Sequence, residues 1–110
     1  DDFTLGLLTN DEVIDVDQDP LGIPGKRVAK NGDLEIWVRE LEDGSKAVGL
    51  FNRGEGVAEV TALWADIGVQ GGQRVRDLWR QKDLGVHKDA FKAYVARHGV
   101  VMTRMWPEDR

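Results

Sequence analysis

The sequence predicts an all-β fold, and three observations point to an antiparallel β-sandwich over residues 25–110. The stretch DLEIWVREL (33–41) alternates apolar and polar residues, which is the period of a half-buried strand. The pair Asp43-Gly44 is typical of a tight hairpin turn, and KAVGLFNR (46–53) has the composition of the returning strand. After residue 25, no stretch has helical periodicity long enough to connect parallel strands. With 110 residues, the chain has the size of one domain.

The first 24 residues have a different pattern, which predicts a short helix followed by a linker. Thr9 and Glu12 have the spacing of a capping box, Val13 and Ile14 supply an apolar patch, and Pro20 ends the helix. The stretch PLGIPGK that follows has the composition of a linker or a wide turn. A helix of one to two turns is unstable alone, so this one needs a surface to pack on.

The other expected strands follow one another at short spacing, separated by turn-rich segments. Together with the first hairpin, the strands are expected at 33–41, 46–53, 57–64, 74–79, 89–95 and 100–105, with a helical turn at 65–68 and a loop at 70–73. Such a series of short strands predicts a two-sheet sandwich.

Composition excludes several classes of partner. The hydrophobic content of 41% and charged content of 32% are those of a globular domain. A net charge of −5 argues against a nucleic-acid or membrane partner, because either would need a clustered basic surface, and no apolar run approaches the ~20 residues of a membrane span. Cysteine is absent, which removes disulfides and thiolate metal sites without fixing the compartment. The chain starts without methionine, as expected of either a trimmed small protein or a domain of a longer one.

An acidic run near the amino terminus raises the question of a metal site. Asp15, Asp17 and Asp19 stand at alternate positions, which is how a calcium-binding EF-hand loop begins. However, such a loop needs a glycine after the third ligand and a glutamate at position twelve, where this chain has Pro20 and Lys26. We therefore expect a solvated acidic helix end and no metal.

Two further carboxylates, Asp77 and Asp83, lie beside expected strand ends and are the candidates for acid–base chemistry. The interpretation that we favour is structural: each binds turn backbone or pairs with a neighbouring cation, Arg76, Arg80 or Lys82.

The two histidines do not form a recognisable site. His87 and His98 lie 11 residues apart without a metal-ligand pattern, and His98-Gly99 predicts a turn. The sequence contains no Ser-His-Asp arrangement, no phosphate-binding glycine loop and no basic aromatic strip. We therefore expect no cofactor.

The tryptophans remain as candidates for contact with another molecule. Trp37, Trp64 and Trp79 fall on expected strands, and Trp106 follows the last one. Small sandwiches commonly bury tryptophan in the core or between domains. Trp37 alternates with Leu34, Ile36 and Val38, so it should lie on the opposite face of its strand. That face meets solvent, a sugar or a partner domain, and we expect a partner domain.

Five stretches occur in the order found in the carboxyl-terminal part of glycoside hydrolase family 27: LLTNDEVIDVDQDPLG, DGSKAVGLFNRG, WADIG, VRDLWRQKDLG and HGVVMTRM. Over about residues 5–105, the chain therefore resembles this family of α-galactosidases (melibiases) and related α-N-acetylgalactosaminidases. The usual form of the first motif is NQDPLG, and this chain has Asp17 in place of its asparagine.

The resemblance implies a catalytic (β/α)8 barrel followed by an antiparallel two-sheet sandwich with Greek-key character. Residues 1–24 would be the end of the last helical segment of the barrel plus a linker, and residues 25–110 the sandwich domain. The two catalytic aspartates of the family lie on barrel strands, so no catalytic residue can be carried over to this chain. A retaining glycosidase also needs two carboxylates ~5 Å apart across a sugar pocket, for which the sequence offers no context.

The expected function is therefore that of a non-catalytic accessory domain that supports the barrel of an α-galactosidase-like enzyme. The resemblance implies that the parent hydrolyses terminal α-galactosides with retention, and a secreted or periplasmic parent is compatible with it. The alternative is a carbohydrate-binding module that stacks an oligosaccharide on an exposed Trp37. The sequence leaves the sugar specificity, the oligomeric state and the localisation open.

Overall fold

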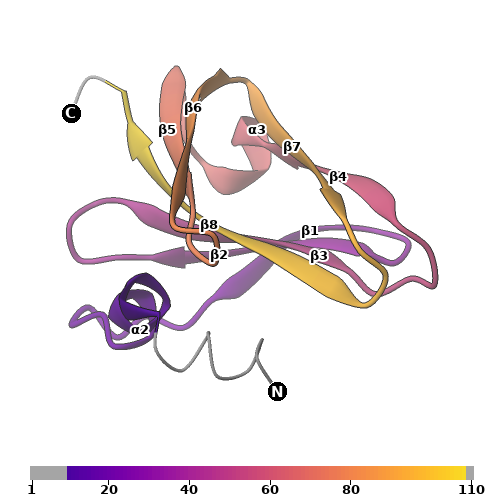
Figure 1. Cartoon of the computed structure of the whole chain (residues 1–110). Coiled ribbons are helices and arrows are strands. Elements are labelled where there is room, and N and C mark those ends of the chain that lie inside the picture. Colours follow the sequence, from indigo (N-terminus) through magenta and orange to yellow (C-terminus); the bar gives the residue numbers. More distant parts are fainter. Residues whose placement is uncertain (1–9, 109–110) are drawn as a thin grey trace.

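Two short helices and eight strands make up residues 10–108, the part of the chain that the computed structural model describes (Figure 1). The helices are α2 (Asp11–Asp17) and α3 (Trp64–Ile67). The strands are β1 (Lys26–Asn31), β2 (Leu34–Glu40), β3 (Lys46–Asn52), β4 (Ala58–Leu63), β5 (Gly72–Asp77), β6 (Lys82–Lys88), β7 (Ala90–Val95) and β8 (Gly99–Pro107).

The strands form two sheets. The larger has six strands in the order β1-β2-β3-β8-β5-β6, and the smaller contains β4 and β7. Every strand pair in the described residues is antiparallel, which confirms the predicted antiparallel sandwich. The Greek-key connectivity stays a prediction.

The hydrophobic core lies between the two sheets. Because side chains alternate along a strand, the six-stranded sheet directs one set of apolar residues toward β4 and β7. The most buried members of this core are Val48, Leu50, Val60, Ala62, Val75, Val95 and Met105. Ile36 and Val38 belong to it too, so the predicted inward stripe of β2 is confirmed.

The other face of the six-stranded sheet carries Trp37. The strand register places Trp37 of β2 opposite Gly49 of β3, and Gly49 opposite Met102 of β8. These three residues therefore lie in one row across the sheet, on the face that points away from the core. The prediction that Trp37 faces away from the aliphatic stripe is confirmed.

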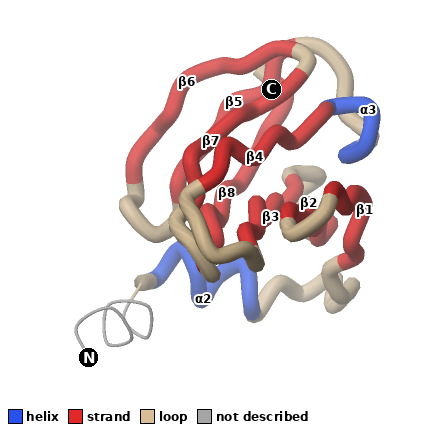
Figure 2. Tube along the Cα trace, turned by 90° about the vertical axis from the view of Figure 1, so that its right-hand side faces the viewer, coloured by secondary structure: helices blue, strands red, loops and turns tan. Residues whose placement is uncertain are grey.

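Helix α2 lies on this outer side, and the β4–β7 sheet covers the other side, as Figures 1 and 2 show. Asn10 caps the helix: its side-chain oxygen accepts hydrogen bonds from the backbone N–H groups of Glu12 and Val13. Asp11 and Glu12 complement the positive end of the helix dipole. The predicted capping box began at Thr9, which lies outside the described residues, and in the structure Asn10 is the N-cap.

Two strands and three tryptophans differ from the predictions. Strands β1 and β6 were not predicted, because both are largely exposed and lack clear alternation. Trp64 begins α3 instead of ending a strand, Trp79 lies in the turn after β5, and Trp106 lies within β8. The predicted helical turn at 65–68 is confirmed by α3, which ends at Gly68 in the left-handed conformation.

Candidate docking face around Trp37

A groove of about 360 Å³ runs between α2 and the outer face of the six-stranded sheet. Residues of α2 line one side, residues of β2, β3 and β8 line the sheet side, and Leu78 and Trp79 of the turn after β5 also contribute. Its apolar lining includes Val13, Val16, Trp37, Phe51, Trp79 and Met102. This volume is within the range of ~300–1,000 Å³ for small-ligand pockets. A groove of this size can also accommodate side chains of a protein partner.

The indole of Trp37 is half-buried in this groove and is fixed by its neighbours. Its Nε1–H donates a 2.9 Å hydrogen bond to Oε1 of Glu35. The ring meets Phe51 edge-on, with 6.3 Å between the ring centroids and 62° between the ring planes. The Arg53 guanidinium lies 5.6 Å from the centroid of the Phe51 ring on the same face. The orientation of Trp37 is therefore set before any other molecule binds.

Glu35 is the charged group on which this arrangement depends. The residue is only 5% exposed, and its other oxygen, Oε2, accepts a 2.9 Å hydrogen bond from Nε of Arg53. Arg27 contributes a third, weaker contact at 3.9 Å. The hydrogen bonds from Trp37 and Arg53 lower the pKa of Glu35 below its ordinary value, because both stabilise the charged form. Glu35 is therefore ionised at neutral pH.

Gly49 forms the floor of the groove beside Trp37. A Cβ atom at this position would lie 2.7 Å from Cε1 of Phe51, so the aromatic ring occupies space that a side chain would need. Arg39, two residues after Trp37 on the same face, also lines the groove. Its Nε atom is buried and has no hydrogen-bond partner among the described residues.

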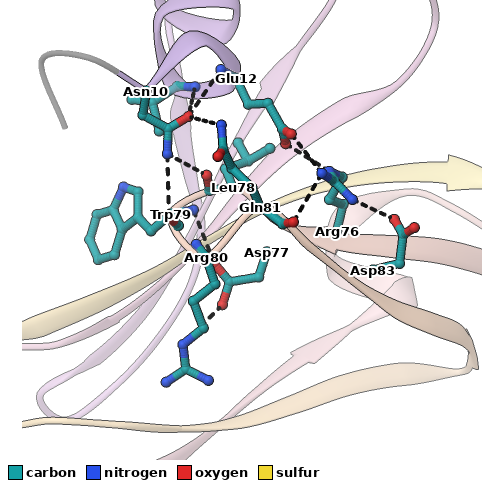
Figure 3. A network of polar contacts seen from close by, with 10 residues as sticks. Asn10, Glu12, Arg76, Asp77, Leu78, Trp79, Arg80, Gln81 and Asp83 are labelled. Carbon is teal, nitrogen blue, oxygen red and sulfur yellow. Dashed lines mark hydrogen bonds and ion pairs between the residues drawn. The ribbon is translucent and has the colours of Figure 1, made fainter. Parts of the chain in front are cut away.

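Helix α2 is tied to the sandwich by the turn that follows β5 (Figure 3). Nδ2 of Asn10 donates to the Leu78 carbonyl at 2.7 Å, while Oδ1 accepts from the helix and, at 3.2 Å, from Nε2 of Gln81. One buried amide therefore caps the helix and anchors it to a turn 68 residues away.

An ion-pair chain forms the second attachment (Figure 3). Arg76 of β5 binds both oxygens of Glu12, through Nε at 2.8 Å and an η-nitrogen at 2.7 Å, and also pairs with Asp83 at 3.0 Å. The hydrogen bonds to Glu12 and Asp83 raise the pKa of Arg76. Such a bidentate contact fixes the relative orientation of the two side chains better than a single hydrogen bond does.

The acidic run forms the third attachment. Asp15 accepts a 2.7 Å hydrogen bond from Arg104 of β8, which also binds Asp43 at 3.1 Å. Asp19 accepts from the backbone N–H groups of Leu21 and Glu42. The run is therefore more than a solvated helix end, because Asp15 is bound to β8 and Asp19 to the turn between β2 and β3.

The other predicted carboxylates have the expected structural roles. Oδ1 of Asp77 accepts from the backbone N–H groups of Trp79 and Arg80, which confirms that it stabilises the turn, and Asp83 pairs with Arg76. Between residues 10 and 108, no three His, Cys, Asp or Glu side chains are grouped so that they could hold a metal ion. Neither helix in this range is long and apolar enough to cross a membrane.

Sequence reasoning identified Trp37 and also singled out Val13 and Trp79, but it did not bring these residues together in one groove. Arg39 shares the alternation of Trp37 within residues 33–41, so the same pattern predicts that it lies on this face. Phe51 and Met102 required the register of β2, β3 and β8, which no local pattern specifies.

The sequence profile of the α-galactosidase C-terminal β-sandwich domain matches residues 31–105. The chain belongs to this family. It is 45% identical over 104 residues to α-galactosidase 2 of Arabidopsis thaliana, a match that covers 93% of this chain and 26% of the relative.

Solved structures agree with this assignment of the α-galactosidase C-terminal domain. The fold matches α-galactosidase I of Mortierella vinacea with a TM-score of 0.90 and 33% identity, over 94% of this chain and 28% of the other. It also matches a family 27 β-L-arabinopyranosidase of Geobacillus stearothermophilus with a TM-score of 0.90 and 30% identity, over 98% and 24% of the two chains. The chain thus spans about a quarter of the length of the proteins that it matches.

Proposed function

We propose that this chain is the non-catalytic C-terminal accessory domain of a longer α-galactosidase-like glycoside hydrolase, and that it supports the catalytic domain. The observation that carries this proposal is the coverage: a family match to a β-sandwich domain, over about a quarter of the length of whole enzymes. The remaining three quarters of such a protein have room for a barrel that holds the reacting carboxylates.

In this proposal, residues 1–24 are the end of the last helical segment of a (β/α)8 barrel plus the linker, and residues 25–110 are the sandwich. The three attachments of α2 support it: Asn10 to Leu78, Glu12 to Arg76, and the acidic run to β8 and the first hairpin. Three contacts along one short helix would hold the end of the barrel against the sandwich, so the two domains would not swing freely.

The reaction of the parent enzyme also belongs to the proposal. We assign it hydrolysis of terminal α-galactosides, following the names of the relatives, with the retention that the resemblance to family 27 implies. The family 27 β-L-arabinopyranosidase among the matches supports a further part of the proposal, namely that this domain does not determine the sugar. Specificity would reside in the loops of the barrel.

The test is a comparison of the 110-residue chain with the full-length protein. The full-length protein is expected to hydrolyse p-nitrophenyl α-galactoside, and the purified 110-residue chain is expected to show no turnover. Turnover by the 110-residue chain that survives repurification would contradict the proposal.

The second candidate function is carbohydrate binding, and it rests on the two tryptophans, Trp37 and Trp79, that line the groove. Titration of the 110-residue chain with galactose and raffinose, followed by tryptophan fluorescence, separates the two functions. A saturable shift that Trp37→Ala abolishes would favour sugar binding. No shift at millimolar sugar is the result expected for a supporting domain.

A further inference from the structure

The turn between β1 and β2 carries an asparagine–glycine pair with a covalent chemistry of its own. Asn31 ends β1, and Gly32 and Asp33 form the two-residue loop that returns the chain to Leu34 of β2. Gly32 has a φ of +60°, a conformation that tight hairpin turns assign to glycine. Among the three asparagines of the 110-residue chain, only Asn31 precedes a glycine. The turn therefore places a side-chain amide beside a main-chain nitrogen that no side chain hinders.

The side-chain amide of Asn31 is exposed and is not held by a neighbour. It makes no hydrogen bond to any other side chain or main-chain group of residues 10–108. A Cβ atom at Gly32 would have no heavy atom within 4 Å apart from its chain neighbours, so the space around the turn is open. Strand β1 lies at the edge of the sheet and pairs only with β2. The tip of this hairpin can therefore open locally, which lets Asn31 leave its extended conformation without disturbing the core.

The other two asparagines have the opposite surroundings. Nδ2 of Asn10 donates to the Leu78 carbonyl at 2.7 Å, and Nδ2 of Asn52 donates to the Val95 carbonyl at 3.0 Å. Both residues are buried, and each is followed by a residue with a long or charged side chain. Their amides are therefore fixed in place and their following main-chain nitrogens are hindered.

The next hairpin turn, at Asp43-Gly44, has a similar backbone but a different side-chain group. Gly44 also has a positive φ, of +85°. The Asp43 carboxylate accepts hydrogen bonds from the backbone N–H and the hydroxyl of Ser45, and its pKa is lowered to about 2, so it is ionised at neutral pH. A nitrogen that attacked this carboxylate would have to expel oxide, whereas attack on the Asn31 amide expels ammonia. The chemistry therefore favours the Asn31 turn.

We propose that Asn31 is a site of spontaneous deamidation. Hydroxide removes the proton from the main-chain nitrogen of Gly32, which attacks Cγ of Asn31: the N–Cγ bond forms, the Cγ–Nδ2 bond breaks, and the leaving nitrogen takes a proton from water to become ammonia. Water then opens the resulting succinimide ring, either at Cγ to give aspartate or at the main-chain carbonyl carbon to give isoaspartate. One water is consumed and one ammonia is released, and no oxidant or reductant takes part. This inference does not depend on the proposed function.

The reaction changes the charge of a cleft of about 320 Å³ between β1, β2 and β4. Asn31 lines this cleft together with Glu59 of β4 and Asp66 of α3, so a carboxylate at position 31 adds a third negative charge to the described lining. Isoaspartate also lengthens the main chain by one methylene group beside the pair that Asn31 forms with Leu34. Deamidation therefore alters both the electrostatics of the cleft and the geometry of the hairpin.

Peptide mapping of the full-length protein tests the site. The folded protein is kept in mildly alkaline buffer, samples are digested at intervals, and mass spectrometry follows the replacement of the amide by a carboxyl group in each asparagine-containing peptide. Deamidation at Asn31 should be at least about tenfold faster than at Asn10 or Asn52, because Gly32 has no side chain to hinder the attack. Fragment spectra should show isoaspartate as well as aspartate at position 31.

Asn31→Gln is the matched control, because its longer side chain would have to close a larger ring. The fast reaction should disappear in this variant, while Asn10 and Asn52 keep their rates. Three results would overturn the proposal. The first is a rate at Asn31 no higher than that at Asn10 and Asn52. The second is aspartate without isoaspartate, which would indicate direct hydrolysis of the amide, and the third is an equally fast reaction in Asn31→Gln.

Discussion

Asn10 and Leu78 are joined by a 2.7 Å hydrogen bond from the Asn10 side-chain amide to the Leu78 carbonyl, across 68 residues of sequence. The same amide caps α2 through its oxygen. A single side chain thus starts the helix and fixes its position on the sandwich: its N–H group donates to the Leu78 carbonyl, while its oxygen caps the helix and also accepts from Gln81.

Substitutions at Asn10 should separate these two tasks. Asn10→Ser keeps a cap and loses the contact to Leu78, whereas Asn10→Ala loses both. We expect Asn10→Ala to lower the free energy of unfolding by about 2 kcal/mol, combining a lost cap with an unsatisfied buried carbonyl. The free energy of unfolding of Asn10→Ser, measured in urea, should lie between those of wild type and Asn10→Ala. Equal stability of Asn10→Ser and wild type would show that the Leu78 contact contributes nothing.

Arg76 allows its two acidic partners to be compared. The side chain of Glu12 is 29% exposed and binds through both oxygens, whereas that of Asp83 is 83% exposed and binds through one. Exposed pairs are screened by water, so Asp83→Asn should barely move the urea midpoint, and Glu12→Gln should lower it several times as far. Similar shifts of the urea midpoint for both variants would mean that the bidentate contact of Glu12 stabilises the fold no more than the single contact of Asp83.

Asp43 should contribute to acid sensitivity. Partial burial raises its pKa, but the hydroxyl and backbone N–H of Ser45, followed by Arg104, outweigh this and lower the pKa from 3.8 to about 2. Because the folded pKa is the lower one, the stabilisation is complete above pH 3.8 and is lost as the pH falls toward 2.

Ser45→Ala removes one of these hydrogen bonds and should raise the pKa of Asp43. The loss of stability in acid should still begin near pH 3.8, but it should be smaller than in wild type and end at a higher pH. Urea unfolding at a series of pH values, with NMR titration of the Asp43 carboxyl, measures both effects. An unchanged pKa in Ser45→Ala would rule out the hydroxyl as a cause.

The core offers a matched pair of leucines. Leu50 on β3 is fully buried, and Leu63 at the end of β4 is 47% exposed. Leu50→Ala should lower the free energy of unfolding by about 3 kcal/mol through lost burial and a residual cavity. Leu63→Ala should cost less than about 1 kcal/mol, as is usual away from the core. Comparable losses of stability for the two variants would mean that Leu50 does not lie in the hydrophobic core between the sheets.

The sequence predicted the strands that contain buried residues and missed the two strands that contain none. The pattern around Trp37 identified β2, and the Asp43-Gly44 turn located its hairpin with β3. Strands β1 and β6 run along the two edges of the large sheet, where one neighbour suffices and few side chains are buried. Edge strands of this kind carry little hydrophobic signal.

The candidate site was only partly predictable for a different reason. The face of Trp37 follows from local alternation, but its groove depends on residues from α2, β2, β3 and β8. Likewise, the partner of Glu12 is Arg76, 64 residues away, whereas local spacing suggested a capping box with Thr9. Contacts between distant segments require the register and the packing, which no single window of sequence contains.

A crystal structure of the full-length protein would decide whether the face around Trp37 is an interdomain surface. We expect the chain upstream of residue 1 to lie in van der Waals contact with the Trp37 indole. A groove open to solvent, with the catalytic domain packed elsewhere, would contradict this assignment.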